Sequence, residues 1–232
     1  AATAAAAGGP ASGAPEERSA FLAFGRWLAP RSATRLENAI AGLREGSTPF
    51  DLVVETQGGT LLEVGCGTGR NLAIAHRHFP DARLYGLDIS QEMLISARKT
   101  FATKAAVPDF RVADATAFTP REFGATGFDR ILISYALSMI PDWERAVDAS
   151  IAALNPGGEL HIVDFGQQEG LPGWFRALLR SWLDKFHVTP RATLREVLQD
   201  KAEQENAQLI FKTIGGGYGW RALIIKTANF YL

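Results

Sequence analysis

Three closely spaced glycines preceded by an acid form the part of this sequence best suited to holding a ligand. Residues 61–71 read LLEVGCGTGRN, which is an apolar segment typical of a strand, a glycine-rich turn and the start of a helical pattern. Glycine permits positive φ and lets a ligand approach the backbone closely. The turn follows G-x-G-x-G, and Arg70 stands where the dinucleotide-binding fingerprint requires its third glycine. The spacing therefore favours a ligand without a pyrophosphate, and a tight turn that binds nothing is the alternative.

Two acids at the ends of the next two predicted strands stand where a bound nucleoside needs them. Asp88 closes the run LYGLD, where a carboxylate can accept hydrogen bonds from both ribose hydroxyls. Its alternative role is a helix N-cap, for which Ser90 is the better candidate. Asp114 ends the following strand and can accept a hydrogen bond from the exocyclic amine of adenine, with Ala115 leaving room for the ring. These positions together indicate a nucleoside site.

S-adenosylmethionine (SAM) matches these features, because it joins a nucleoside to an amino acid and has no pyrophosphate. Glu63, just before the glycines, can engage the ammonium group of that amino acid. Ile89 and Met93 can sandwich the adenine ring, although each of them taken alone is typical of a core residue. We therefore predict SAM as the cofactor.

The candidate ligand residues lie where predicted strands end and helices begin. Helical periodicity is found at Asn71–His78, Gln91–Thr103 and Asp142–Leu154, and Leu154–Gly158 is predicted to be a helix stop and turn. Alternating strands and helices predict a parallel sheet with helices on both faces. The glycine-rich connection 214–219 predicts a hairpin, and hence one antiparallel strand. The predicted strands are Thr60–Val64, Arg83–Leu87, Asp109–Val112, Phe128–Ser134, Glu159–Asp164, Gln208–Thr213 and Trp220–Thr227.

Composition narrows the class of protein. The 232 residues suffice for one large α/β domain, and the formal net charge of −1 excludes a global attraction to nucleic acid or anionic lipid. Cys66 is the only cysteine, which fits a reducing compartment such as the cytoplasm. No apolar run reaches the length of a membrane span. The four histidines lack ligand spacing with cysteines or acids, so no metal site is predicted.

The chain is predicted to have three parts. Residues 1–15 are almost all Ala, Gly, Pro and Ser, which predicts a disordered tail; a secretory signal is the alternative, but basic residues and leucines are missing there. Residues 16–58 are predicted to be a helical cover, and residues 59–232 the SAM-binding domain.

GCGTG at 65–69, the strand-ending Asp88, ADAT at 113–116 and LNPGGELHIVDF at 154–165 resemble the class I SAM-dependent methyltransferases in order and spacing. The resemblance covers about residues 58–230 and implies a Rossmann-like α/β fold: a seven-stranded, mostly parallel sheet whose last strand is antiparallel. It implies that Glu63, Gly65, Gly67, Asp88, Ile89, Asp114, Ala115 and Ser134 line the SAM pocket, to which we add Cys66, Thr68 and Asn71 of the loop and Met93.

A narrower likeness concerns the acceptor. Residues 133–143, 161–191 and 217–226 look like the bacterial N-methyltransferases of betaine lipid synthesis, which trimethylate the amine of diacylglyceryl-homoserine. In that family a tyrosine-rich segment precedes the SAM fold, whereas residues 16–58 contain no tyrosine. Either another segment closes the site, or the acceptor differs. We expect a cytoplasmic protein, and since no apolar run is long enough to span a membrane, any contact with a membrane would be made from the side.

Tyr135 and Asp164 are the candidate acceptor-site residues, because both lie at the carboxyl ends of central strands. Tyr135 can orient an amine through its oxygen or its π face, or it is an ordinary packed aromatic. Asp164 can attract the amine or accept its proton, or it caps a loop. His161 is predicted to be structural, because its side chain points to the other face. Arg191 and Arg195 can pair with an acceptor carboxylate or be solvated surface residues.

The apolar spacing of Leu171–Val188 predicts a helix that either lies in a membrane interface or packs on the sheet. The predicted partner is an amino-lipid or another amine acceptor, and no nucleic acid. The alternatives are a SAM enzyme with a small soluble acceptor, a nicotinamide-dependent oxidoreductase, and a non-catalytic binding module.

Overall fold

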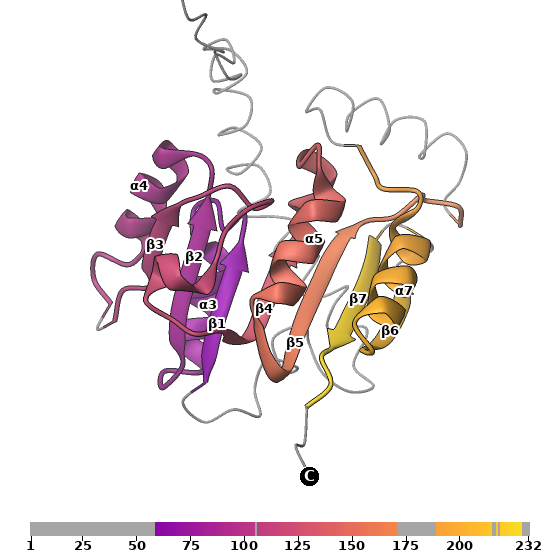
Figure 1. Ribbon diagram of the computed structural model, residues 1–232. Helices are drawn as coiled ribbons and strands as arrows, with labels where there is room; N and C mark the ends of the chain where they lie inside the picture. The colour runs from indigo at the N-terminus through magenta and orange to yellow at the C-terminus, as the bar shows by residue number, and fades with distance from the viewer. Residues whose placement is uncertain (1–58, 105, 171–188, 215–216, 218, 229–232) are drawn as a thin grey trace, which may run out of the picture. The chain divides into compact units, whose positions relative to one another are not determined.

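The computed structural model describes residues 59–104, 106–170, 189–214, 217 and 219–228, all within the compact unit Pro49–Leu232. In these residues seven strands form one sheet of order β3-β2-β1-β4-β5-β7-β6 (Figure 1). β7 is antiparallel to both of its neighbours, and the pairs among β1 to β5 are parallel. The strands are β1 Thr60–Val64, β2 Arg83–Asp88, β3 Asp109–Val112, β4 Phe128–Ser134, β5 Leu154–Phe165, β6 Gln208–Ile214 and β7 Gly219–Ile225.

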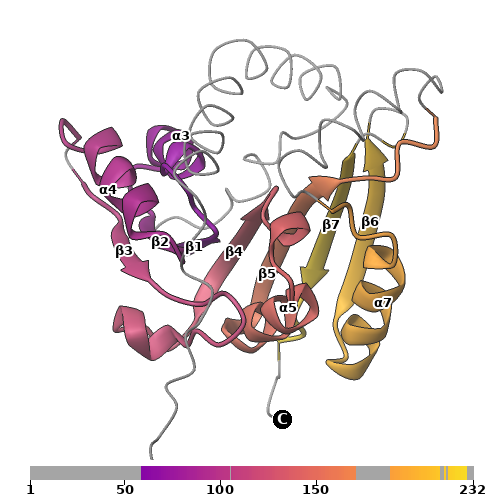
Figure 2. The ribbon, with the colours of Figure 1, turned by 90° about the horizontal axis from the view of Figure 1, so that it is seen from above.

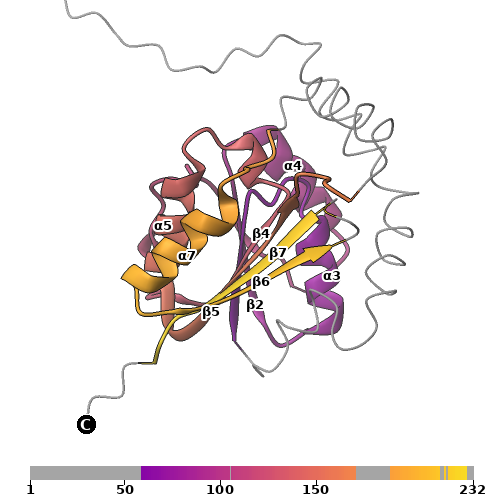
Figure 3. The same ribbon diagram turned by 90° about the vertical axis from the view of Figure 1, so that its right-hand side faces the viewer.

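Helices pack on both faces of this sheet, because the central strands are apolar on both sides. Leu62 and Val64 of β1 belong to the core under α5 and α7, whereas Leu61 belongs to the core under α3 and α4. Figures 2 and 3 show α5 and α7 on one side of the sheet and α3 on the other. The helices are α3 Arg70–His78, α4 Gln91–Thr100, α5 Trp143–Ala152 and α7 Leu194–Gln204, with 3₁₀ turns η2 Pro120–Phe123 and η3 Leu137–Met139.

The sheet has the predicted architecture, including the hairpin of β6 and β7 that makes the last strand antiparallel. The fifth strand was predicted too short: it begins at Leu154 instead of Glu159, so the predicted turn at Leu154–Gly158 is wrong. The reason is pairing with the preceding strand, since Phe128 of β4 pairs with Leu154 and the register shifts before Arg130.

Helix ends were also predicted imperfectly. α4 ends at Thr100 and α5 at Ala152, both before the predicted ends. α7 was not predicted, although Leu194, Leu198 and Ala202 form a buried stripe at helical spacing. The predicted tail 1–15, the predicted cover 16–58 and the predicted helix Leu171–Val188 lie outside the described residues.

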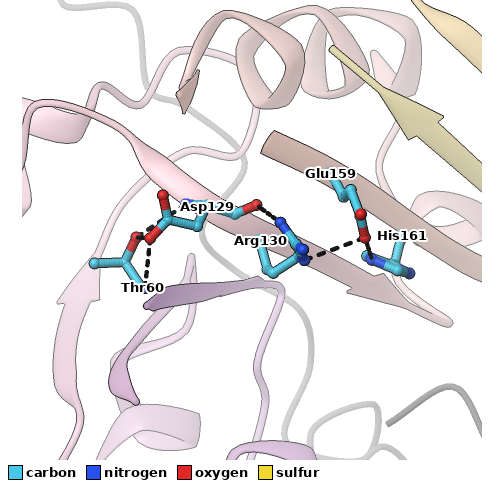
Figure 4. A network of polar contacts seen from close by, with 5 residues as sticks. All are labelled: Thr60, Asp129, Arg130, Glu159 and His161. Atoms are coloured by element: carbon cyan, nitrogen blue, oxygen red, sulfur yellow. Dashed lines mark hydrogen bonds and ion pairs between the residues drawn. The ribbon is translucent and has the colours of Figure 1, made fainter. Parts of the chain in front are cut away.

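A polar network joins the amino ends of β1 and β4 to the middle of β5 (Figure 4). Asp129 Oδ2 accepts hydrogen bonds from the amide and hydroxyl of Thr60 at 2.8 and 2.9 Å. Arg130 Nε lies 3.1 Å from Glu159 Oε2, and the same oxygen lies 2.9 Å from His161 Nε2. His161 is thus a buried residue in the middle of β5, held by its contact with Glu159.

Candidate active site

The carboxyl ends of β1, β2, β3, β4 and β5 meet at one edge of the sheet, here called the carboxyl edge. Gly65 and Gly67 begin the turn after β1 with φ of +70° and +51°, values that only glycine adopts readily. A Cβ on Gly65 would lie 2.7 Å from Cβ of Ala136, so that this turn packs directly on the loop after β4. A Cβ on Gly67 would meet nothing within 4 Å, so the backbone there faces open space.

Glu63 is a buried carboxylate with one free oxygen beneath this turn. Its side chain is 2% exposed, and Oε1 accepts a hydrogen bond of 2.7 Å from Asn71 Nδ2 at the start of α3. Oε2 has no hydrogen-bond partner among the residues that the structure describes. Burial raises the pKa of Glu63 to about 8, against the hydrogen bond from Asn71 and together with the charge of Asp88. A bound cation, such as the ammonium group predicted for this position, would give Oε2 a partner and would offset the cost of burying the charged carboxylate.

Asp88 joins the glycine turn to the next strand end. Oδ2 accepts a hydrogen bond of 2.8 Å from the amide of Gly67, and Oδ1 accepts one of 2.9 Å from the amide of Ser90. Ser90 caps α4, since its hydroxyl accepts from the amide of Met93. Burial raises the pKa of Asp88, and the two amides oppose this. Carboxylate oxygens have further lone pairs, so Asp88 can still accept from ribose hydroxyls.

The end predicted for adenine is open and partly apolar. Ile89 is 72% exposed, whereas Met93 is buried in the first turn of α4. Asp114 is exposed, and its Oδ1 accepts hydrogen bonds of 2.8 Å from the amide and hydroxyl of Thr116, which lower its pKa. Ala115 is half-buried beside it. The exposed apolar side chain of Ile89 suits the face of an aromatic ring, and the exposed carboxylate of Asp114 suits a polar group on its rim.

Two loop residues predicted to bind the cofactor have other surroundings. Cys66 is buried in a core cluster with Leu72 and Phe110, and burial raises the pKa of its thiol. Its side chain therefore packs under the turn, and the predicted cofactor contact of Cys66 would be made by its backbone. Thr68 is exposed, and its carbonyl accepts a hydrogen bond of 3.0 Å from the hydroxyl of Thr100 in α4.

The loop after β4 supplies the candidate acceptor residue Tyr135. Ser134 ends β4 half-buried, and Tyr135 follows with φ of +53°, an unusual value for a tyrosine. The amide of Tyr135 donates to the carbonyl of Val163 at 2.7 Å. Its ring centroid lies 4.8 Å from that of Phe165, and a Cβ on Gly219 would lie 3.9 Å from its hydroxyl. The strands β5 and β7 therefore flank the tyrosine.

Asp164 lies beneath the same loop. It is 2% exposed, and its oxygens accept hydrogen bonds of 3.0 Å from the amide of Ser138 and 2.7 Å from the amide of Phe165. Burial raises the pKa of Asp164, and these two amides oppose this. The geometry favours the loop cap over direct contact with an acceptor, because Asp164 is buried, unlike the half-buried Asp88, and its oxygens are engaged by backbone amides.

Arg191 completes the support of this loop, in a way that the sequence did not reveal. Its Nε and one terminal nitrogen donate to the carbonyls of Leu137 and Ile140 at 3.1 and 2.6 Å. The amide of Thr189 donates to the carbonyl of Ser138 at 3.0 Å. Arg191 is thus bound to backbone carbonyls, which neither sequence-based expectation for it had included. These contacts are here called the loop clamp.

The residues present fit a SAM molecule. The turn offers an open backbone at Gly67, Glu63 offers an unpartnered buried oxygen for an ammonium group, and Asp88 has remaining acceptor capacity. The described ranges contain no cluster of three or more His, Cys, Asp or Glu side chains able to hold a metal ion. Nor does any helix within them have the length and apolar character needed to cross a membrane.

Comparisons with known proteins agree with this geometry. Residues 61–158 match the family model described as "Methyltransferase domain". The chain is 32% identical over 102 residues to a trans-aconitate 2-methyltransferase of Variovorax paradoxus (strain S110), covering 44% of this chain and 37% of that protein. It is 33% identical over 121 residues to a phosphatidylethanolamine N-methyltransferase of Cereibacter sphaeroides, covering 50% of this chain and 56% of that protein. The chain therefore spans about a third to a half of these relatives.

Solved structures share the fold of this chain. The plantazolicin methyltransferase BpumL, in complex with a triazolic desmethylPZN analog and SAH, superposes with a TM-score of 0.68 at 18% identity and covers 92% of each chain. The [4+2]-cyclase SpnF also shares the fold, with a TM-score of 0.61 at 16% identity over 78% of this chain and 80% of that one. The fold by itself thus does not fix the reaction. Residues 61–158 are thus similar to the methyltransferase domain family, and the described chain has the Rossmann-like fold of the solved methyltransferases.

Proposed function

We propose that this protein is an N-methyltransferase that methylates the amine of an amino-lipid headgroup of the diacylglyceryl-homoserine type. The observation that carries the proposal is the carboxyl edge itself, where Glu63 and Asp88 lie at the glycine turn and Ala136, next to Tyr135, packs on Gly65. The likeness of 133–143, 161–191 and 217–226 to betaine-lipid enzymes and the match to a phosphatidylethanolamine N-methyltransferase support an amine on a lipid headgroup.

The residues of this chain would bind and align the two reactants. When bound, SAM supplies a methyl group on a sulfonium, which is a good leaving group. Glu63 would hold the ammonium end of the donor, Asp88 the ribose and Asp114 the adenine amine. Tyr135 would orient the acceptor amine with its hydroxyl or its π face. Alignment of this kind contributes roughly 7–11 kcal/mol to the lowering of a bimolecular barrier.

The acceptor must react as the uncharged amine, because an ammonium has no lone pair. The nitrogen forms a bond to the methyl carbon, the bond from carbon to sulfur breaks, and the product ammonium gives its proton to water before the next methylation. Asp164 is engaged by two backbone amides, so we assign it the support of the loop that carries Tyr135. No side chain is then required as a base.

Labelled lipid products test this proposal directly. The protein is incubated with methyl-labelled SAM and membranes that contain diacylglyceryl-homoserine, and the lipids are separated by thin-layer chromatography. Label in a betaine lipid is expected. Asp88→Ala should abolish it, whereas Asp129→Asn, in the network at the other end of the sheet, should lower stability and leave label incorporation intact. Unchanged activity of a folded Asp88→Ala variant would refute the assignment of the SAM site.

A small soluble acceptor is the second candidate, and the match to trans-aconitate 2-methyltransferases favours it. Sedimentation with anionic and zwitterionic liposomes separates the two. If the acceptor is a lipid, we expect the protein to sediment with the liposomes, and a variant that lacks Leu171–Val188 should stay in the supernatant. A protein that stays in the supernatant and methylates a small soluble acceptor, such as trans-aconitate, would support the second candidate.

A further inference from the structure

Gln168 combines two unfavourable features at one residue. Its backbone has φ of +59°, a conformation that costs free energy for any residue other than glycine. Its side chain is 1% exposed, and Oε1 has no hydrogen-bond partner within the described part of the chain. A buried carbonyl oxygen without a donor also costs free energy. Such costs gather where a ligand later compensates them.

The direction of the unpartnered oxygen is fixed by its neighbour. Nε2 of the same amide donates to the carbonyl of Gly166 at 2.7 Å. Exchanging nitrogen and oxygen would place two acceptors against each other, so the amide has one orientation. The backbone amide of Gln168 donates to the carbonyl of Gly217 at 2.8 Å, which holds the residue against the β6–β7 hairpin. The oxygen is therefore a preorganised acceptor rather than a rotating one.

Gln168 lies on the acceptor side of the site. It follows β5 by three residues, and it contacts Gly217, two residues before Gly219, beside which the hydroxyl of Tyr135 lies. Tyr135 is also held at positive φ, and the third such non-glycine residue in the described chain, Asn206, follows α7 elsewhere. Strained backbone thus gathers at the carboxyl ends of β4 and β5.

We propose that Gln168 Oε1 accepts a hydrogen bond from an N–H of the acceptor amine and thereby sets its lone pair toward the methyl group. This inference rests on the proposed function, and it makes Gln168 a residue that determines the specificity of the site among primary, secondary and tertiary amines. A neutral amide oxygen suits this task, because it orients an uncharged amine without stabilising the unreactive ammonium as a carboxylate would. Primary and secondary amines offer an N–H in their reactive form, whereas a tertiary amine offers none.

This difference gives the test. Gln168→Met keeps the length of the side chain and removes the acceptor oxygen. Its kcat/KM is compared with that of the wild type for a primary amine acceptor and for the N,N-dimethyl derivative of the same molecule, with diacylglyceryl-homoserine tried first and soluble amines next. We expect a loss of about tenfold or more for the primary amine and about twofold or less for the dimethyl derivative, with an unchanged Kd for S-adenosylhomocysteine. Asn206→Asp, at the other strained position, should change neither rate.

The outcomes separate this inference from the function on which it rests. An equal loss for both acceptors would show that Gln168 has only a structural role and would overturn the inference while leaving the methyltransferase proposal standing. A wild type that binds S-adenosylhomocysteine but methylates no amine of either kind would overturn both. A smaller loss for the primary amine than for the dimethyl derivative would also contradict the inference.

Discussion

At the scale of single residues, Glu63 shows how a binding group lowers the stability of the free protein. Its carboxylate is buried, one of its oxygens has no partner among the described residues, and its pKa is raised to about 8 from an ordinary value of 4.5. Between these two pH values the unfolded chain releases the proton and the folded chain keeps it. The free energy of unfolding therefore falls as pH rises from 4.5 to 8 and is level above that.

Glu63→Gln is expected to stabilise the free protein and to remove donor binding. The gain in unfolding free energy should grow with pH and reach roughly 1–3 kcal/mol near pH 8, because glutamine bears no charge that burial penalises. Urea unfolding at pH 5 to 8 measures the gain, and calorimetry with S-adenosylhomocysteine measures the lost affinity.

The matched control is Glu159→Gln, because burial of Glu159 is outweighed by His161 and Arg130, which lower its pKa. That substitution should destabilise the protein at neutral pH and leave affinity unchanged. Equal stability of wild type and Glu63→Gln at every pH would contradict the account of Glu63.

At the scale of elements, the loop clamp connects the segment before α7 to the turn η3. Arg191→Ala removes both hydrogen bonds to the carbonyls of η3 and its flank, so Tyr135 should lose its fixed position. We expect kcat to fall by about tenfold and the Kd for S-adenosylhomocysteine to stay the same. Arg191→Lys should restore little, since one ammonium does not reproduce the planar pair of donors. Steady-state kinetics and calorimetry measure the two effects.

Arg195→Ala serves as the control, because Arg195 lies four residues on with its guanidinium 5.6 Å from the ring centroid of Phe211. It should leave kcat unchanged. If Arg191→Ala lowered donor affinity as much as kcat, the clamp would support the whole carboxyl edge rather than the acceptor loop alone.

The elements and contacts that depend on residues close together in the sequence could be predicted from the sequence. The glycine turn, the strand-ending Asp88 and the β6–β7 hairpin are short patterns with fixed spacing. Contacts between distant segments were not predictable in this way. The packing of Ala136 on Gly65 and the attachment of Arg191 to η3 depend on how strands assemble, and no local pattern encodes them. Likewise, the buried side of Cys66 follows from where α3 and β3 pack.

At the scale of the whole molecule, donor binding and folding are linked. S-adenosylhomocysteine at a hundred times its Kd should add about 2.7 kcal/mol to the unfolding free energy. For a chain of this size that corresponds to a rise of about 5–10 °C in Tm. NADH should give no shift, since the turn lacks the pyrophosphate fingerprint. A shift with NADH and none with S-adenosylhomocysteine would favour the oxidoreductase.

The late strand β7, inserted between β5 and β6, has a consequence for the order of synthesis. Every residue proposed to hold the donor lies between 63 and 134, whereas the surroundings of Tyr135 include Phe165 and Gly219. During synthesis the residues proposed to hold the donor therefore leave the ribosome before the β6–β7 hairpin that borders Tyr135. The acceptor side of the site is therefore completed last, when β7 pairs with β5.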